Sequence, residues 1–173
     1  MIKQSCKGFT LIELMVVICL FGFLVTLALM NISFLDTTIV RTELDKLTTF
    51  CYYVQQKAIA TNKEAVVTFD TTKHEYYSDK NREKLSSRVS FGFFDNAQGP
   101  PGQPVGPIKN AITFSGQRIH FYPTGIISSG TVYLIDKAKK SMYALSNAVS
   151  QLSYLRMYRF DGSWKLLIPG KCV

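Results

Sequence analysis

The chain has 173 residues, of which 47% are hydrophobic and 13% aromatic, and its 20 Lys and Arg residues outnumber its 12 Asp and Glu residues, a formal net charge of +8. This composition excludes a wholly disordered chain, and the length fits one domain with at most a small appendage. Four cysteines are too few for a disulfide-rich miniprotein, and their spacing is not that of a zinc site.

The N-terminal part of the chain contains a long apolar run. Between positions 9 and 35 the only charged residue is Glu13. As a helix at about 1.5 Å per residue, this run would extend roughly 40 Å, which exceeds the roughly 30 Å hydrocarbon core of a bilayer. We therefore expect residues 9–35 to cross a membrane. Lys3 and Lys7 precede the run and favour a cytoplasmic N-terminus, with the rest of the chain on the other side.

Glu13 is the feature of this run that needs an explanation. A carboxylate at the centre of a spanning helix costs roughly 2.5–3.5 kcal/mol, so such a residue is a functional candidate. A cleaved secretory signal is one alternative, but Ala28-Leu29-Met30-Asn31 lacks the small residues of a cleavage site. A lipoprotein signal does not fit either, because Ile18 precedes Cys19. An ordinary signal anchor explains every feature except Glu13.

The segment Gly8-Phe9-Thr10-Leu11-Ile12-Glu13, after a short basic leader, resembles the class III signal of type IV prepilins and pseudopilins. The resemblance implies that residues 1–8 are a leader, that a prepilin peptidase cuts between Gly8 and Phe9, and that it methylates the new amino group of Phe9. It also implies that Glu13 guides assembly by pairing with the N-terminal amine of a neighbouring subunit. Phe9 and Glu13 are four residues apart and share one helix face, and an α-amine with a pKa near 8 is largely protonated at neutral pH.

A helical pattern continues over residues 36–61. Apolar side chains recur there at spacings of three and four, with polar and charged side chains between them. These apolar positions are Ile39 or Val40, Leu44, Leu47, Phe50 or Cys51, Val54 and Ala58. We expect one nearly continuous helix from about Phe9 to Thr61, whose second half packs this stripe on a globular core.

Residues 62–173 are predicted to form a β-rich domain. Apolar residues alternate with polar ones in short segments separated by turn signals, which predicts antiparallel strands, and Asp161-Gly162 predicts a tight hairpin. The strands are expected at 65–70, 74–78, 88–94, 111–114, 118–122, 130–136, 142–146, 152–160 and 164–168. Residues 96–110 contain four of the six prolines and predict an exposed loop, or alternatively a loop that docks a partner.

Two segments of this domain resemble the minor pseudopilin H and FimT-like family. They are Phe121–Gly125 with Ser128–Leu134, and the helix end Gln56–Ala60 leading into Ala65–Phe69. The resemblance implies a type IV pilin-like fold of class α+β, with a long N-terminal transmembrane and amphipathic helix followed by an antiparallel β-sheet domain. Some FimT-like members bind DNA through a C-terminal Gly-Arg-x-Arg motif, of which only Arg156 coincides here.

The positive charge is concentrated in the C-terminal part. Residues 36–108 hold nine basic and nine acidic side chains, whereas residues 109–173 hold nine basic and two acidic ones, a net +7. Basic side chains interleaved with aromatic ones are the pattern expected for phosphate contact and base stacking. The candidates for polyanion binding are Lys137, Lys139, Lys140, Arg156, Arg159 and Lys165. The alternatives are a solvated face, whose charge deters aggregation, or contact with filament neighbours.

The sequence points to no catalytic chemistry. Cys51 and Cys172 could form a disulfide in an oxidising periplasm; the alternative is two unpaired thiols, one buried in the helix stripe. His74 and His120 are isolated and lack metal-ligand spacing, and no Gly-x-Ser-x-Gly or Cys-x-x-Cys motif occurs. We therefore expect no enzyme activity, no metal site and no cofactor.

These features predict a minor pseudopilin or minor pilin, a single-pass inner-membrane protein whose C-terminal domain is periplasmic. It would be processed after Gly8 and assembled into the filament of a type II secretion system or a type IV pilus. Its partners would be prepilin peptidase, other pilin or pseudopilin subunits and the inner membrane. The alternative is a pilus-tip minor pilin that binds DNA for natural transformation through the basic C-terminal region. A signal-anchored periplasmic domain that is never processed is the remaining interpretation.

Overall fold

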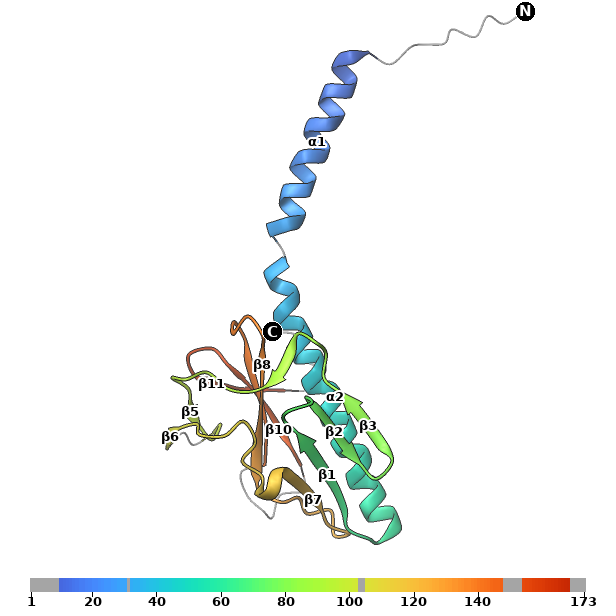
Figure 1. The fold of residues 1–173 in the computed structure, drawn as a ribbon, viewed down its shortest axis with the longest axis vertical. Coiled ribbons are helices and arrows are strands. Elements are labelled where there is room, and N and C mark those ends of the chain that lie inside the picture. The colour runs from blue at the N-terminus through green and yellow to red at the C-terminus, as the bar shows by residue number, and fades with distance from the viewer. Residues whose placement is uncertain (1–9, 31, 103–104, 148–153, 169–173) are drawn as a thin grey trace, which may run out of the picture. The chain divides into compact units, whose positions relative to one another are not determined.

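The structure is a computed structural model that describes residues 10–30, 32–102, 105–147 and 154–168. The predicted leader, Phe9 and Cys172 lie outside these ranges. The chain divides into two compact units, residues 1–35 and residues 36–173 (Figure 1).

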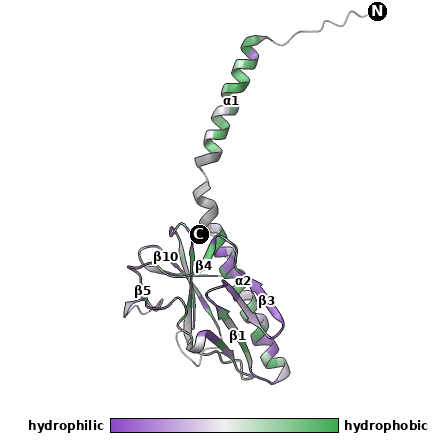
Figure 2. Ribbon diagram, in the orientation of Figure 1, coloured by the Kyte–Doolittle hydropathy of each residue, from purple (hydrophilic) through white to green (hydrophobic). Residues whose placement is uncertain are grey.

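The helix of the first unit is α1, Leu11–Met30. Every side chain from Leu11 to Leu27 is exposed, although nearly all of them are apolar. Figure 2 shows hydrophobic residues along most of this helix. The sequence predicts a membrane span over residues 9–35. Among the described residues, no helix is both long enough and apolar enough to cross a membrane.

The helix α2 extends over Ile32–Thr61, and its residues from 36 onward belong to the second unit. Its buried apolar residues confirm the predicted stripe: Val40, Leu44, Leu47, Cys51, Val54 and Ala58. The helix ends as predicted, at Thr61, because Asn62 adopts a left-handed conformation with φ 51°. The N–H of Asn62 then bonds to the carbonyl of Ile59 and the N–H of Lys63 to that of Ala58, each at 3.2 Å, which is a Schellman cap.

Two antiparallel sheets follow α2. The four-stranded sheet has the order β3-β2-β1-β7 and the five-stranded sheet the order β11-β10-β9-β8-β4, with a separate β5–β6 pair. The strands are β1 Ala65–Asp70, β2 Glu75–Ser78, β3 Asn81–Lys84, β4 Val89–Phe91, β5 Gln98–Gly99, β6 Gly106–Pro107, β7 Arg118–Phe121, β8 Gly130–Asp136, β9 Met142–Asn147, β10 Arg156–Phe160 and β11 Trp164–Leu167, with a 3-10 turn at Ser115–Gln117. The fold class is therefore α+β with antiparallel sheets, as predicted.

The main core lies between α2 and the inner faces of the two sheets. One hydrophobic cluster joins the α2 stripe to Val67 and Ile119 of the four-stranded sheet and to Val132 and Leu145 of the five-stranded sheet. Because one continuous cluster spans all three elements, the helix and both sheets fix one another in place. The surface side chains of α2 and of both sheets therefore keep defined positions relative to one another within the second unit.

Several predicted strands differ in their bounds. Residues 111–114 form no strand: Ile112 makes an isolated bridge to Val132, and a 3-10 turn begins at Ser115. The strand predicted at 88–94 covers only Val89–Phe91. The strand predicted from residue 74 begins at Glu75, because His74 adopts a left-handed conformation with φ 54°.

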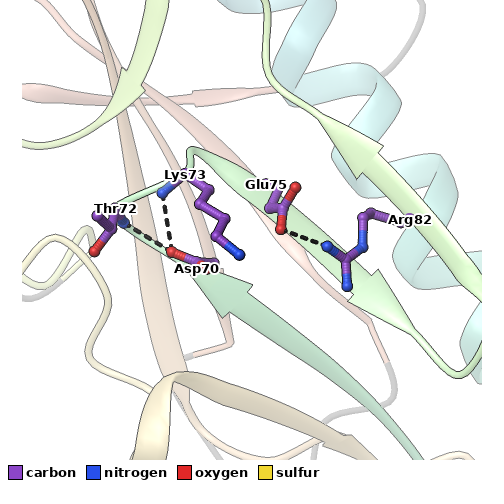
Figure 3. Close-up of polar contacts among 5 residues, drawn as sticks. All are labelled: Asp70, Thr72, Lys73, Glu75 and Arg82. Carbon is purple, nitrogen blue, oxygen red and sulfur yellow. Dashed lines mark hydrogen bonds and ion pairs between the residues drawn. The ribbon is translucent and has the colours of Figure 1, made fainter.

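The strand β3 is absent from the sequence-based prediction. All four of its residues are exposed, so it has no apolar alternation. It is an edge strand, and the ion pair between Arg82 Nη1 and Glu75 Oε1, at 2.8 Å, holds it to β2 (Figure 3). In the turn before β2, Asp70 Oδ1 accepts hydrogen bonds from the N–H groups of Thr72 and Lys73, each at 2.9 Å. These polar contacts add to the backbone pairing of β1 with β2 and of β2 with β3.

The proline-rich segment 96–110 is in part buried, and the prediction of an exposed loop is wrong at those positions. Ala97 is 1% exposed and Pro101 is buried, whereas Val105 is 90% exposed. The segment covers the outer face of the five-stranded sheet, where Trp164 Nε1 donates a hydrogen bond of 2.6 Å to the carbonyl of Gln98. The outer face needs this cover because it carries apolar side chains such as Met142.

Candidate functional site

The N-terminus of α1 is closed by a reciprocal hydrogen-bond pair between Thr10 and Glu13. Glu13 Oε2 accepts hydrogen bonds from the N–H and from Oγ1 of Thr10, each at 2.9 Å. In return, the N–H of Glu13 donates to Thr10 Oγ1 at 3.3 Å. This is a capping box, in which the first residue before the helix and the third residue within it satisfy each other's polar groups. Sequence reasoning assigned Glu13 a neighbour's amine as partner and missed Thr10, although Thr-x-x-Glu before an apolar run is the usual signature.

The capping box places the predicted assembly residue at the start of the described helix. The carboxylate of Glu13 is held by Thr10 of its own chain, the residue that follows the predicted N-terminal Phe9. Gly8 and Phe9, the predicted cleavage and methylation residues, lie outside the described residues. A carboxylate near a helix N-terminus also interacts favourably with the helix dipole. The local sequence therefore supplies hydrogen-bond donors to the carboxylate of Glu13 without help from another subunit.

Five of the six predicted polyanion-binding residues lie at one end of the five-stranded sheet. Lys137, Lys139 and Lys140 form the turn between β8 and β9. Arg159 on β10 lies directly across from Lys165 on β11. The β8–β9 and β10–β11 turns share this end of the sheet, because Met142 is paired both with Ile135 on β8 and with Phe160 on β10.

Arg156 lies apart from the other five. It occupies the opposite end of β10, paired with Ser146, and it is three residues from Arg159, so the two side chains leave opposite faces of the sheet. Its guanidinium stacks over the ring of Tyr154 at 5.2 Å and its Nη2 donates a 2.6 Å hydrogen bond to Tyr154 Oη. This hydrogen bond and a second one to Tyr158 raise the pKa of Arg156 above its usual range. The structure therefore does not gather all six cations into one surface.

Hydrogen bonds to Asp136 hold the backbone of the β8–β9 turn, and its lysines form no ion pair with any described residue. Asp136, which is 3% exposed, accepts hydrogen bonds at Oδ1 from the N–H groups of Lys140 and Ser141, at 2.7 and 2.8 Å. Lys139 adopts a left-handed conformation with φ 51°. Lys139 also lines a hollow of about 500 Å³ beside Phe160. From the sequence, Asp136 was counted only as a negative charge. Its position four residues before Lys140, at the start of the turn, is the signal that could have shown its role as a hydrogen-bond acceptor for the turn.

The neighbouring β10–β11 turn is partly neutralised. Lys165 Nζ and Asp161 Oδ2 form an ion pair at 2.7 Å. This hydrogen bond, the charge of Lys165 and the charge of Arg159 lower the pKa of Asp161. The net positive charge of this end of the sheet therefore comes mainly from the three lysines of the β8–β9 turn and from Arg159.

The predicted disulfide has one end inside the described residues. Cys51 is a free, fully buried thiol in the α2 stripe, and burial raises its pKa. Cys172 lies outside the described residues, so the pairing of Cys51 with Cys172 stays a prediction. His120 Nδ1 contacts Glu64 Oε1 at 2.5 Å. No group of His, Cys, Asp and Glu side chains in the described part of the chain is arranged to bind a metal ion.

Comparison with known proteins bears on the N-terminal segment. Residues 3–29 match the prokaryotic N-terminal methylation motif, which confirms the resemblance drawn from Gly8, Phe9 and Glu13. The chain is thus an α+β protein that carries a methylation motif at its N-terminus. Among solved structures, it is similar to the minor pseudopilin EpsH from the type 2 secretion system of Vibrio cholerae, with 13% identity and a TM-score of 0.47, over 76% of this chain and 98% of that chain. No curated protein matches the chain.

Proposed function

We propose that this chain is a minor pilin or pseudopilin, a structural filament subunit without enzymatic activity. It is made as a precursor that prepilin peptidase cleaves after Gly8 and methylates at Phe9. The match of residues 3–29 to the methylation motif carries this proposal. The Thr10–Glu13 capping box supports it, because it explains how an apolar helix accommodates a carboxylate near its first turn.

The surface of α1 supports a role in assembly. Its side chains are exposed from Leu11 to Leu27 and are almost all apolar. A helix that is apolar on all sides has to be covered by lipid or by other apolar helices. We assign lipid of the inner membrane to the precursor and α1 helices of neighbouring subunits to the assembled filament. Lys3 and Lys7 keep the N-terminus in the cytoplasm, and the C-terminal domain is periplasmic.

In the filament, Glu13 is proposed to change partner. Before assembly its carboxylate accepts the two hydrogen bonds from Thr10. The protonated amine of Phe9 in a neighbouring subunit then supplies a full positive charge, which attracts a carboxylate strongly in apolar surroundings. This pairing would set the axial position of each new subunit. The same chemistry serves a type II secretion pseudopilus and a type IV pilus.

A second function, DNA capture by a minor pilin at a pilus tip, is favoured by the basic end of the five-stranded sheet. Lys137, Lys139, Lys140 and Arg159 lie there together, and the three lysines are exposed on a turn whose backbone is hydrogen-bonded to Asp136. Phosphate contacts of this kind weaken steeply as salt rises. Duplex DNA should therefore shift in a gel at low salt and not at high salt. No shift at low salt would remove this second function.

The first test is the mass of the chain with and without prepilin peptidase. With the peptidase, the expected N-terminus is methylated Phe9 and residues 1–8 are lost. A Gly8→Val variant should keep residues 1–8, because a branched side chain crowds the bond to be cleaved. A chain that keeps its leader in the presence of active peptidase, or that is cleaved elsewhere, contradicts the proposal.

A further inference from the structure

A groove of about 550 Å³ between α2 and the β2–β3 hairpin combines aromatic rings with carboxylates (Figure 1). Phe50 and Tyr76 form part of its lining, and their rings meet edge to face with centroids 5.1 Å apart. Tyr53, about one turn further along α2, also lines the groove and is 53% exposed. The groove therefore offers an exposed tyrosine ring in a hollow, which is typical of surfaces that bind another protein.

The carboxylates give this groove a negative charge. Asp45 of α2 and Glu83 of β3 line it and are exposed. Among the described residues, neither of them forms an ion pair. Lys46 also lines the groove, but its Nζ is paired with Glu43 Oε1 at 2.9 Å, so these two charges offset each other. Two carboxylates can therefore receive a cation here, although the whole chain carries a net +8.

One of these carboxylates lies close to the aromatic floor of the groove. Burial raises the pKa of Tyr76, and the negative charge of Glu83 raises it further. Both residues line the same hollow. A cation that binds Glu83 is therefore brought next to aromatic rings, whose faces attract positive charge.

The neighbouring hairpin already binds an arginine with this pair of groups. The guanidinium of Arg82 lies over the ring of Tyr77, 5.0 Å from its centroid. Its Nη1 pairs with Glu75 Oε1 at 2.8 Å (Figure 3). The ring contacts the face of the planar cation and the carboxylate accepts its N–H groups. The groove presents the same two kinds of partner, and its described lining contains no arginine.

The combination of ring and carboxylate favours arginine over lysine as the occupant. A guanidinium is planar and weakly hydrated, so it can stack on a ring and donate to carboxylates at the same time. A lysine ammonium is a compact and strongly hydrated charge, which a half-open hollow strips of water at a greater cost. We therefore expect the occupant to carry an arginine.

The expected source of this arginine is a different protein. A minor subunit is present in fewer copies than the main subunit of its filament, so its neighbours are other subunits. Opposite charges on two surfaces also suppress contact with wrong partners, which suits a subunit that has to find one neighbour among several.

We propose that the groove between α2 and β3 binds an arginine on the surface of a different subunit of the same filament. The guanidinium stacks on Tyr53 and donates hydrogen bonds to Glu83 and Asp45. This inference rests on the proposed function, because it takes its partner from the filament.

The test uses the full chain in cells that assemble the filament, with photo-reactive benzoylphenylalanine in place of Thr42. Thr42 is exposed and lines the groove, so the probe leaves the rings and carboxylates of the groove unchanged. Mass spectrometry identifies the cross-linked protein and the residue that is joined. The expected partner is a different protein with its own N-terminal methylation motif, joined next to an arginine. A joined residue without a neighbouring arginine overturns the inference, and so does a second copy of this chain.

Substitutions in the groove then test its chemistry. Glu83→Gln should lower the cross-link yield roughly two- to fivefold, as the loss of one exposed ion pair does. Tyr53→Leu keeps an apolar side chain but removes the ring face, and it should lower the yield by a similar factor. Asp95→Asn and Tyr122→Leu are the matched controls, because both residues are exposed and do not line the groove. A yield that neither groove variant lowers, or that the controls lower equally, overturns the inference.

Charge exchange between the two proteins completes the test. Replacing the mapped arginine of the partner by glutamate should lower the yield, and Glu83→Arg in this chain should then restore most of it. Lysine in place of that arginine should retain part of the yield, since it keeps the charge and loses the stacking. Failure of the exchange to restore the cross-link overturns the pairing with Glu83.

N-terminal sequencing of the same samples separates this inference from the proposed function. Chains that begin at Phe9 and enter filaments, but form no cross-link that depends on Glu83, overturn the inference alone. Chains that retain the leader overturn the proposed function. A cross-link to an arginine in such chains supports the groove as a binding site of the folded domain.

Discussion

Gln55 of α2 donates a hydrogen bond of 2.7 Å from Nε2 to the carbonyl oxygen of Gly125, which lies 70 residues further along the chain. Gln55 is 4% exposed and Gly125 is buried. Gly125 has φ 83°, so it forms the tight turn after β7 that presents its carbonyl to the helix. This hydrogen bond joins α2 to the loop between β7 and β8, which connects the two sheets.

Replacing Gln55 should therefore destabilise the second unit. Gln55→Leu keeps much of the side-chain volume but leaves the buried carbonyl of Gly125 without this donor, at a cost of about 1–3 kcal/mol. Thermal and urea denaturation measure the loss. Gln56→Leu is the matched control, because Gln56 is exposed, and it should change the free energy of unfolding by less than about 0.5 kcal/mol. Equal stability of the two variants would show that the Gln55 bond contributes nothing.

Gly130, at the start of β8, should not tolerate a side chain. A Cβ built there would lie 2.5 Å from the ring of Phe114 and 2.9 Å from its Cα, and the backbone atom cannot move aside easily. Gly130→Ala should cost roughly 1–3 kcal/mol, as overpacking of a close contact does. Gly106→Ala is the control, because a Cβ at Gly106 meets nothing within 4 Å. The melting temperatures of the two variants measure the difference. A Gly130→Ala variant as stable as Gly106→Ala would contradict the predicted clash with Phe114.

The helix stripe and several strands could be read from the sequence because one face of each is buried. Spacings of three and four identify Val40, Leu44 and Leu47, and the ranges expected for β1 and β8 agree with the structure. The edge strand β3 could not be found in this way, since its four residues are all exposed and their pairing to β2 depends on backbone hydrogen bonds.

The sequence analysis missed that the proline-rich segment covers the outer face of the five-stranded sheet. All six residues of β9, Met142–Asn147, are buried, because both faces of this strand are covered. Such a strand requires material on both sides of the sheet. Composition identifies the proline-rich segment as a loop but does not say which face it covers. That depends on contacts such as the one between Trp164 and Gln98.

The candidate polyanion site shows what charge counting leaves out. The net charge of residues 109–173 says nothing about which cations meet, because the strand register decides it. The sequence could have shown that Arg156 and Arg159 do not share a surface, since side chains three residues apart on a strand leave opposite faces of the sheet. Asp136 organises the lysine turn through its buried carboxylate, and this role depends on an exact loop geometry that no count of acidic residues reveals.

The burial of Tyr133 predicts that the second unit becomes less stable at alkaline pH. Tyr133 is 1% exposed on the outer face of the five-stranded sheet, and burial raises its pKa from the ordinary 10.0 to about 12. Burial favours the neutral phenol, so the stabilisation is complete below pH 10, the unfolded value. It declines as pH rises from there and is lost above about pH 12.

Urea denaturation at pH 8 and at pH 11 measures this effect. The wild-type chain should lose free energy of unfolding between the two pH values, on the order of 1 kcal/mol from this tyrosine. Tyr133→Phe removes the ionising group and should reduce the loss, whereas Tyr122→Phe, at a 41% exposed tyrosine, should not. The same pH dependence in Tyr133→Phe and in the wild type would exclude Tyr133 as a source.

Glu13 offers a test that separates the charge of its side chain from its role in the helix cap. Glu13→Gln keeps an oxygen that can accept the hydrogen bonds of Thr10, and glutamine is accepted in capping boxes, but it has no charge. Glu13→Leu removes both. We expect prepilin peptidase to cleave both variants after Gly8, since the cap lies beyond the bond that is cut.

Incorporation into sheared filaments then distinguishes the two roles. If the carboxylate pairs with the Phe9 amine of a neighbour, Gln and Leu should impair incorporation alike, because neither attracts a cation. If the cap alone matters, the Gln variant should assemble like the wild type. The processed fraction in membranes is the control for expression. Normal incorporation of Glu13→Leu would refute any role of this residue in assembly, and the exposed apolar surface of α1 would then have to guide the subunit without it.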